Sequence, residues 1–71
     1  MHATPTDLAN ARCLPDAFRP ARKADTYVND ATDAKFFVSY ATLSRLINVN
    51  LVRVRNDERG HYYETVRGVQ F

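Results

Sequence analysis

Several residue types are scarce in this chain of 71 residues, and each shortage excludes a class of protein. A single cysteine, Cys13, cannot form an intrachain disulfide, and a lone thiol suits a reducing compartment. Two glycines are too few for a glycine-rich phosphate loop. The two histidines, His2 and His61, do not stand at a metal-ligand spacing from Cys13. We therefore predict no metal, no cofactor and no catalytic residues. Only a Cys13–His61 pair brought together by the fold would supply an activated nucleophile.

Long apolar runs are also missing. Residues 1–20 hold three prolines and no apolar run of seven, which indicates no secretion signal. No stretch approaches the ~18 apolar residues of a membrane span. The length allows one domain at most, with a core that contributes about 3–5 kcal/mol net. We expect a cytoplasmic protein that makes no membrane contact and is a monomer or a weak dimer when free.

The distribution of charge says more than its sum, a formal net charge of +2. Residues 1–35 hold as many acidic as basic side chains, whereas residues 36–71 hold five arginines against Asp57, Glu58 and Glu64. Arginine is the basic residue best suited to bidentate and stacked contacts. The excess positive charge therefore belongs to the C-terminal half of the chain.

Prolines and glycines divide the chain into two parts. All three prolines lie in the first twenty residues, and both glycines lie in the last twelve. We predict that residues 1–25 form an irregular arm, because its prolines deny it strand pairing, with Thr6 capping a short helix over residues 7–13. Residues 26–71 are predicted to form the β domain. The fold class is α+β, with three to four antiparallel strands and a short helix.

A hairpin over residues 50–67 is the clearest element. Valine and arginine alternate before a turn at residues 57–60, and Gly60 supplies the positive φ that such a turn needs. Only one register keeps the two faces of the hairpin distinct. It places Asn56 opposite His61, Val54 opposite Tyr63, Arg53 opposite Glu64, and Val52 opposite Thr65.

This register predicts one apolar and one basic face. Arg53, Arg55, Tyr62 and Glu64 share the basic face. The predicted core contains Phe37, Leu46, Val52, Val54 and Tyr63. Val69 and Phe71, after Gly68, are expected to fold back onto it.

The segment that follows a strand at residues 35–40 fits two structures. Leu43, Leu46 and Ile47 have the i, i+3, i+4 spacing of a helix, whereas Ile47, Val49 and Leu51 alternate as in a strand. Periodicity does not decide between helix and strand in short apolar segments, so both stay open for residues 41–49.

Two groups of residues are candidates for binding a partner. On the hairpin, arginine beside tyrosine can stack on bases, grip phosphate or pair with a partner's acids. In the arm, an aromatic residue followed by three basic residues can anchor and steer a complex. The alternatives are a solvated sheet face, in which Arg53 pairs with Glu64 and Arg55 lies over Tyr62, and a solubilising tail. The candidate residues are Leu8, Phe18, Arg19, Arg22, Lys23, Arg53, Arg55, Arg59 and Tyr62.

The segments Ser39–Thr42 and Tyr63–Thr65 resemble a pattern of small phage-encoded proteins, in which a Ser-Tyr-x-Thr segment opens a β-meander that a Tyr-x-Thr-Thr strand closes. Val66 and Gly68 depart from it, where threonine and histidine are usual. The size, the basic sheet and the arm also look like lytic-phage regulators that bind host RNA polymerase. That resemblance implies a non-enzymatic protein that alters transcription by inhibiting initiation or by antitermination.

Three functions follow from these features. The first is a regulator that binds a large host protein complex, with RNA polymerase as the favoured target and nucleic acid as a secondary contact. The second is a nucleic-acid binder: a helix over residues 41–48 followed by the hairpin would resemble the end of a winged helix, with residues 57–60 as the wing tip. Two acids at that tip and a low net charge weigh against it. The third is a subunit whose sheet edge completes a homodimer.

Overall fold

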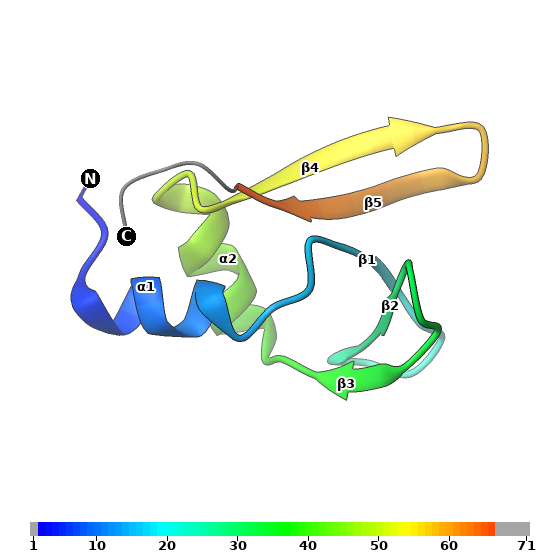
Figure 1. Cartoon of the computed structure of the whole chain (residues 1–71), viewed down its shortest axis with the longest axis horizontal. Helices are drawn as coiled ribbons and strands as arrows, with labels where there is room; N and C mark the ends of the chain where they lie inside the picture. Colours follow the sequence, from blue (N-terminus) through cyan, green and yellow to red (C-terminus); the bar gives the residue numbers. More distant parts are fainter. Residues whose placement is uncertain (1, 67–71) are drawn as a thin grey trace.

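The structure, a computed structural model, describes residues 2–66, which form two helices and a five-stranded sheet (Figure 1). Neighbouring strands are all antiparallel, in the order β3-β2-β1-β5-β4. The α+β class is confirmed, with five strands where three to four were predicted. The elements are α1 (Pro5–Arg12), β1 (Ala17–Pro20), β2 (Thr26–Asn29), β3 (Lys35–Phe37), α2 (Tyr40–Asn48), β4 (Val52–Asp57) and β5 (Gly60–Thr65).

Both helices lie at one end of the molecule, and the β4–β5 hairpin extends away from them (Figure 1). Within residues 2–66, neither helix combines the length and the apolar character needed to cross a membrane. The predicted positions of Val69 and Phe71 lie outside the described residues.

The segment predicted to be an irregular arm supplies the central strand of the sheet. β1 pairs with β2 on one side and with β5 on the other. Pro15 precedes β1 and Pro20 is its last residue, so the prolines bracket the strand instead of interrupting its ladder. The prediction that residues 1–25 make no strand pairing is therefore wrong, and a boundary at residue 25 would separate β1 from β2.

Helix α1 begins earlier than predicted. Thr4, not Thr6, is its N-cap, because Pro5 fits the first helical position, where its missing N–H has no intrahelical partner. The Thr4 hydroxyl accepts a hydrogen bond from the Asp7 N–H (3.2 Å), and the Asp7 carboxylate accepts one from the Thr4 N–H (2.9 Å). This capping box fixes Asp7 where it can also contact α2.

The segment left open between helix and strand forms helix α2. The Ser39 hydroxyl caps it by accepting a hydrogen bond from the Thr42 N–H (3.2 Å). Leu43 and Leu46, three positions apart, are both buried on one side of the helix. Asn50, with φ of 64°, takes the left-handed conformation that follows the helix end and leads into β4.

The predicted register of the hairpin is confirmed. All four predicted pairs are present, and Asp57 also pairs with Gly60. The turn itself is thus limited to Glu58 and Arg59, two residues instead of four. Gly60 has a φ of 110°, as predicted for this position.

The core is centred on the Phe18 ring, which is fully buried. Its centroid lies 5.4–5.6 Å from those of Tyr27, Phe36 and Tyr63, which come from three other strands. Leu46 and Val52 are buried as predicted, and Tyr63 packs against the core while partly buried. Leu43 completes the set of fully buried large side chains.

Two predicted core residues are instead exposed. Phe37 is 75% exposed, since its neighbour Phe36 is the residue of β3 that faces the core. Val54 is 50% exposed, although it lies on the same face as Val52. Figure 1 shows the reason: α2 lies beside the start of β4, where Val52 is buried, and the hairpin extends beyond the helix.

Replacing the buried and the exposed phenylalanine with alanine should have opposite outcomes. Phe18→Ala should cost about 3–5 kcal/mol, enough to leave a domain of this size largely unfolded. Phe37→Ala should change stability by no more than about 0.5 kcal/mol. Chemical denaturation followed by circular dichroism measures both. Similar losses in the two variants would contradict the burial described above.

Acid should weaken the attachment of α1 to α2. Arg45 donates hydrogen bonds to Asp7 at 2.9 and 3.1 Å, and these, followed by the Thr4 N–H, lower the pKa of Asp7 to about 2. A carboxyl with a lowered folded pKa stabilises the fold above its ordinary pKa, and this contribution is lost as the pH falls through the folded value.

The melting temperature should therefore drop between about pH 4 and pH 2. Asp7→Asn should remove part of this drop, whereas Glu58→Gln, at the exposed hairpin turn, should leave it unchanged. Thermal melts across this pH range test the expectation, and an equal drop in wild type and Asp7→Asn would contradict it.

Candidate partner-binding surface

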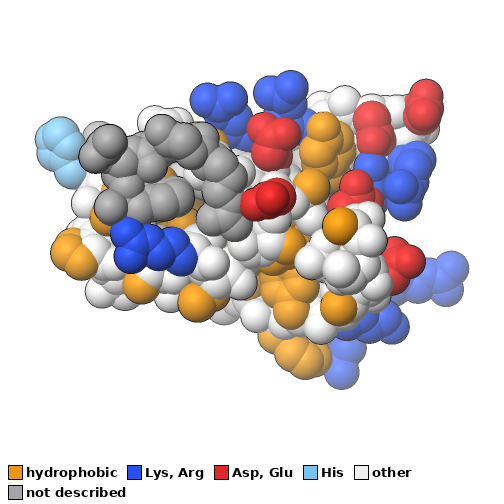
Figure 2. All heavy atoms as spheres, in the orientation of Figure 1, with side chains coloured by type: hydrophobic (Ala, Val, Ile, Leu, Met, Phe, Trp, Pro, Cys, Tyr) orange, Lys and Arg blue, Asp and Glu red, His pale blue; other side chains and the backbone are white. Residues whose placement is uncertain are grey.

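The outer face of the β4–β5 hairpin carries two arginines that make no ion pair with the described residues. Arg53 and Arg55 alternate along β4 and are exposed. Within residues 2–66, neither forms an ion pair, so the Arg53–Glu64 pair of the alternative, a solvated sheet face, is not made. Figure 2 shows Lys and Arg side chains standing out above this hairpin, with acidic side chains near its turn. The two arginines are thus free to meet a partner.

Arg19 organises this face of the sheet from the central strand. Its guanidinium donates to Asp30 (2.8 Å) and to Asp57 (2.5 Å), and it lies 5.0 Å from the centre of the Tyr62 ring. These contacts join β1, the turn after β2, the end of β4, and β5. Arg19, not Arg55, is therefore the residue that lies over Tyr62.

Electrostatics support a structural role for Arg19. Its hydrogen bonds to Asp57 and then Asp30 raise the pKa of its guanidinium, and the same contact lowers the pKa of the Asp57 carboxyl. The Arg19 side chain is only 15% exposed, and two carboxylates neutralise it. The prediction that Arg19 steers a partner is not supported, because its charge is used within the fold.

The other predicted binding residues are distributed over the molecule. Phe18 is buried and cannot anchor a partner, so that prediction is wrong. Leu8 is partly buried and packs against the core. Arg22 and Lys23 lie exposed in the turn between β1 and β2. Arg59 is exposed at the hairpin turn, 3.7 Å from Asp30.

Two aromatic side chains form a second exposed group. Phe37 ends β3, and Tyr40, 74% exposed, begins α2. Sequence reasoning missed the exposure of both, because Phe37 was assigned to the core and Tyr40 to the strand at residues 35–40. The exposure of Val54 was missed because it depends on how far α2 extends along β4.

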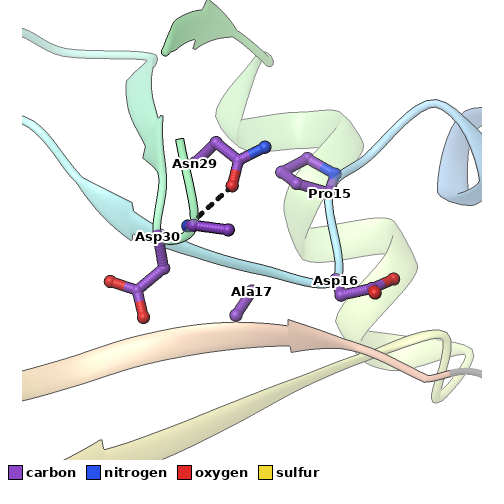
Figure 3. A pocket seen from close by; sticks show the side chains of 6 residues that line it. Pro15, Asp16, Ala17, Asn29 and Asp30 are labelled. Atoms are coloured by element: carbon purple, nitrogen blue, oxygen red, sulfur yellow. Dashed lines mark hydrogen bonds between the residues drawn. The ribbon is translucent and has the colours of Figure 1, made fainter. Parts of the chain in front are cut away.

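A pocket of about 430 Å³ opens between the start of β1 and the turn after β2 (Figure 3). Its wall contains Asp16, Asn29 and Asp30 beside short apolar side chains. Asn29 accepts a hydrogen bond from the Ala31 N–H (2.9 Å), and Asp30 is held by Arg19. Within residues 2–66 no group of three or more His, Cys, Asp and Glu side chains is placed to hold a metal ion.

The fold does not bring Cys13 and His61 together. Cys13 caps the end of α1, and His61 follows the hairpin turn, where its ring makes a T-shaped contact with the Tyr63 ring. Figure 1 shows the end of α1 on the helical side of the molecule, well separated from the hairpin turn.

Comparisons with protein-family models, with curated proteins and with solved structures found no match for this chain. Its function is therefore inferred from the surface that the fold creates.

Removing the guanidinium of Arg19 should release the turn of the hairpin. In Arg19→Gln the pKa of Asp57 should rise towards its ordinary value, because hydrogen bonds from Arg19 are the largest cause of its lowering. Carboxyl carbon chemical shifts followed through an acid titration measure this pKa. Arg53→Gln removes a charge from the same face without touching Asp57 and serves as the control. An unchanged Asp57 titration in Arg19→Gln would mean that the contact does not form in solution.

Proposed function

We propose that this protein is a small non-enzymatic regulator that binds an acidic surface of a larger protein through the outer face of the β4–β5 hairpin. The observation that carries the proposal is the pair Arg53 and Arg55, exposed and without ion pairs in the part of the chain described. Exposed arginines on a fixed strand can bind carboxylates bidentately with little loss of conformational freedom.

The proposed target is host RNA polymerase, in the cytoplasm of a bacterium infected by a phage that encodes the protein. Support for this target comes from the resemblance of residues 39–42 and 63–65 to small phage proteins and from the basic character of the sheet. Occupation of an acidic surface of the polymerase would alter initiation or termination of transcription.

A nucleic-acid binder is the second candidate, because the segment before the hairpin is helical, as a winged helix requires. The charges of that helix argue against it. Arg45 is the one basic residue of α2, and it is paired with Asp7. The wing tip carries Asp57 and Glu58 against one cation, Arg59, whereas phosphate contacts need an excess of cations. Protein binding therefore fits the surface better.

Binding to purified bacterial RNA polymerase should depend on the hairpin arginines. The double variant Arg53→Gln/Arg55→Gln should slow association about tenfold at low salt and much less at high salt, because exposed charges steer the encounter. The matched control is Arg22→Gln/Lys23→Gln, which removes two exposed charges from the β1–β2 turn. Surface plasmon resonance at two salt concentrations measures the rates.

Equal effects of the two double variants would show that net charge, not the hairpin, steers binding. No association of the wild type with polymerase would refute this target. A tagged protein that recovers polymerase from a bacterial lysate only before nuclease treatment would favour the nucleic-acid binder instead.

A further inference from the structure

Strand β4 is an open edge of the sheet. It is the last strand in the order β3-β2-β1-β5-β4, and at six residues it is twice as long as β3 at the other edge. Within residues 2–66 no strand pairs with its outer side. An open edge offers unpaired backbone N–H and C=O groups to another extended chain.

The hydrogen-bond pattern identifies which residues of β4 offer these groups. The Thr65 N–H donates to the Asp16 carbonyl on the β1 side (2.9 Å), so the pair of Val52 and Thr65 is not hydrogen-bonded across β4 and β5. Bonded and non-bonded pairs alternate in an antiparallel ladder. The backbone groups of Val54 and Asn56 therefore point away from β5, towards solvent.

Side chains on the two faces of β4 specify what would fit beside it. Arg53 and Arg55 lie on one face, exposed and without ion pairs in the described part of the chain. Val54 lies on the other face, where it is 50% exposed. A strand added to this edge would place its alternate residues against these two surfaces.

We infer that β4 binds an extended acidic segment of the partner protein as a sixth antiparallel strand. Acidic residues of that segment lie opposite Arg53 and Arg55, and an apolar residue between them lies opposite Val54. Backbone hydrogen bonds to Val54 and Asn56 provide affinity, and the arginines select for acid. This inference rests on the proposed function and names the chemistry of its partner.

A second copy of the same chain fits this edge poorly. Two antiparallel β4 strands can pair only in registers that place the outward-pointing backbone N–H and C=O groups of one strand opposite those of the other. These groups belong to every second residue, including Val54 and Asn56, so every second register is excluded. In the two registers of greatest overlap, either Arg53 faces Arg55, or Arg55 faces Arg55 while Arg53 faces Asp57, a carboxylate that Arg19 already binds. Like charges directly opposite one another destabilise a strand pair. The arginines therefore disfavour self-association and favour an acidic segment.

The fold also holds β4 ready for such a partner. Arg19 ties Asp57, at the far end of the strand, to the central strand β1. Val52, at the near end, is buried beneath α2. An edge strand fixed at both ends loses little freedom when another strand pairs with it.

The test uses a capped peptide of alternating glutamate and valine, with three glutamates and two valines. In the expected register, the backbone N–H of the peptide valine opposite Val54 points towards β4. The N–H groups of the glutamates on either side of it point away from β4. One derivative carries a methyl group on that valine nitrogen, and a matched control carries it on a neighbouring glutamate nitrogen. Titration of the isotope-labelled protein, followed by amide shifts of Val54 and Asn56, gives the affinities.

Methylation of the valine nitrogen should weaken binding roughly tenfold, because it removes one interchain hydrogen bond and crowds the edge, whereas methylation of the glutamate nitrogen should have little effect. Arg53→Gln/Arg55→Gln should also weaken binding of the plain peptide. No binding of the plain peptide would overturn strand addition, and so would equal effects of the two methyl groups.

The failures of the two proposals are distinguishable. If the double variant weakens binding while neither methyl group does, the arginines hold acid through side chains alone: the proposed function stands and strand addition is wrong. If the double variant binds the peptide as the wild type does, the hairpin arginines select no acidic partner and both proposals fail. Displacement of the peptide by an oligothymidylate of equal charge would assign the surface to nucleic acid.

Discussion

The sheet depends on the packing of the Phe18 side chain, whose ring is removed from water by its neighbours. Aromatic rings from β2, β3 and β5 surround the Phe18 ring. They can all contact it because β1 is the central strand of the sheet. Aromatic rings bury a large area and prefer the edge-to-face and offset contacts seen here. A chain of this size has few other means of stabilisation, so the contacts of this one ring join four of the five strands.

The residue next to Phe18 organises the opposite face. Successive residues of a strand point to opposite sides, so burial of Phe18 places Arg19 on the outer face. There it binds the carboxylates of Asp30 and Asp57. Because these acids are engaged by Arg19, they are less available to Arg53 and Arg55. The charge that can recognise a partner is thus a consequence of how the core is formed.

The sequence predicted local features better than distant ones. Alternation determined the register of the hairpin, because both strands and their turn lie within residues 52–65. The basic hairpin face was predicted for the same reason. β1 was missed because it is four residues long, flanked by prolines and ordered only by strands distant in sequence. Phe18 and Arg19 were therefore taken for an exposed anchor and a steering charge. Likewise, the exposure of Val54 depends on where α2 ends, which no local pattern encodes.

The central position of β1 also constrains the order in which the protein can be completed. The Thr65 hydroxyl donates to the Pro15 carbonyl (2.8 Å) across a separation of 50 positions. A growing chain can pair β1 with β2, and β2 with β3, early, but the other side of β1 stays open until β5 has been synthesised. Such distant pairings form slowly, because a long loop must close first. During that interval the side of β1 that β5 will occupy is accessible to other strands, so synthesis of the final hairpin is the step that closes it.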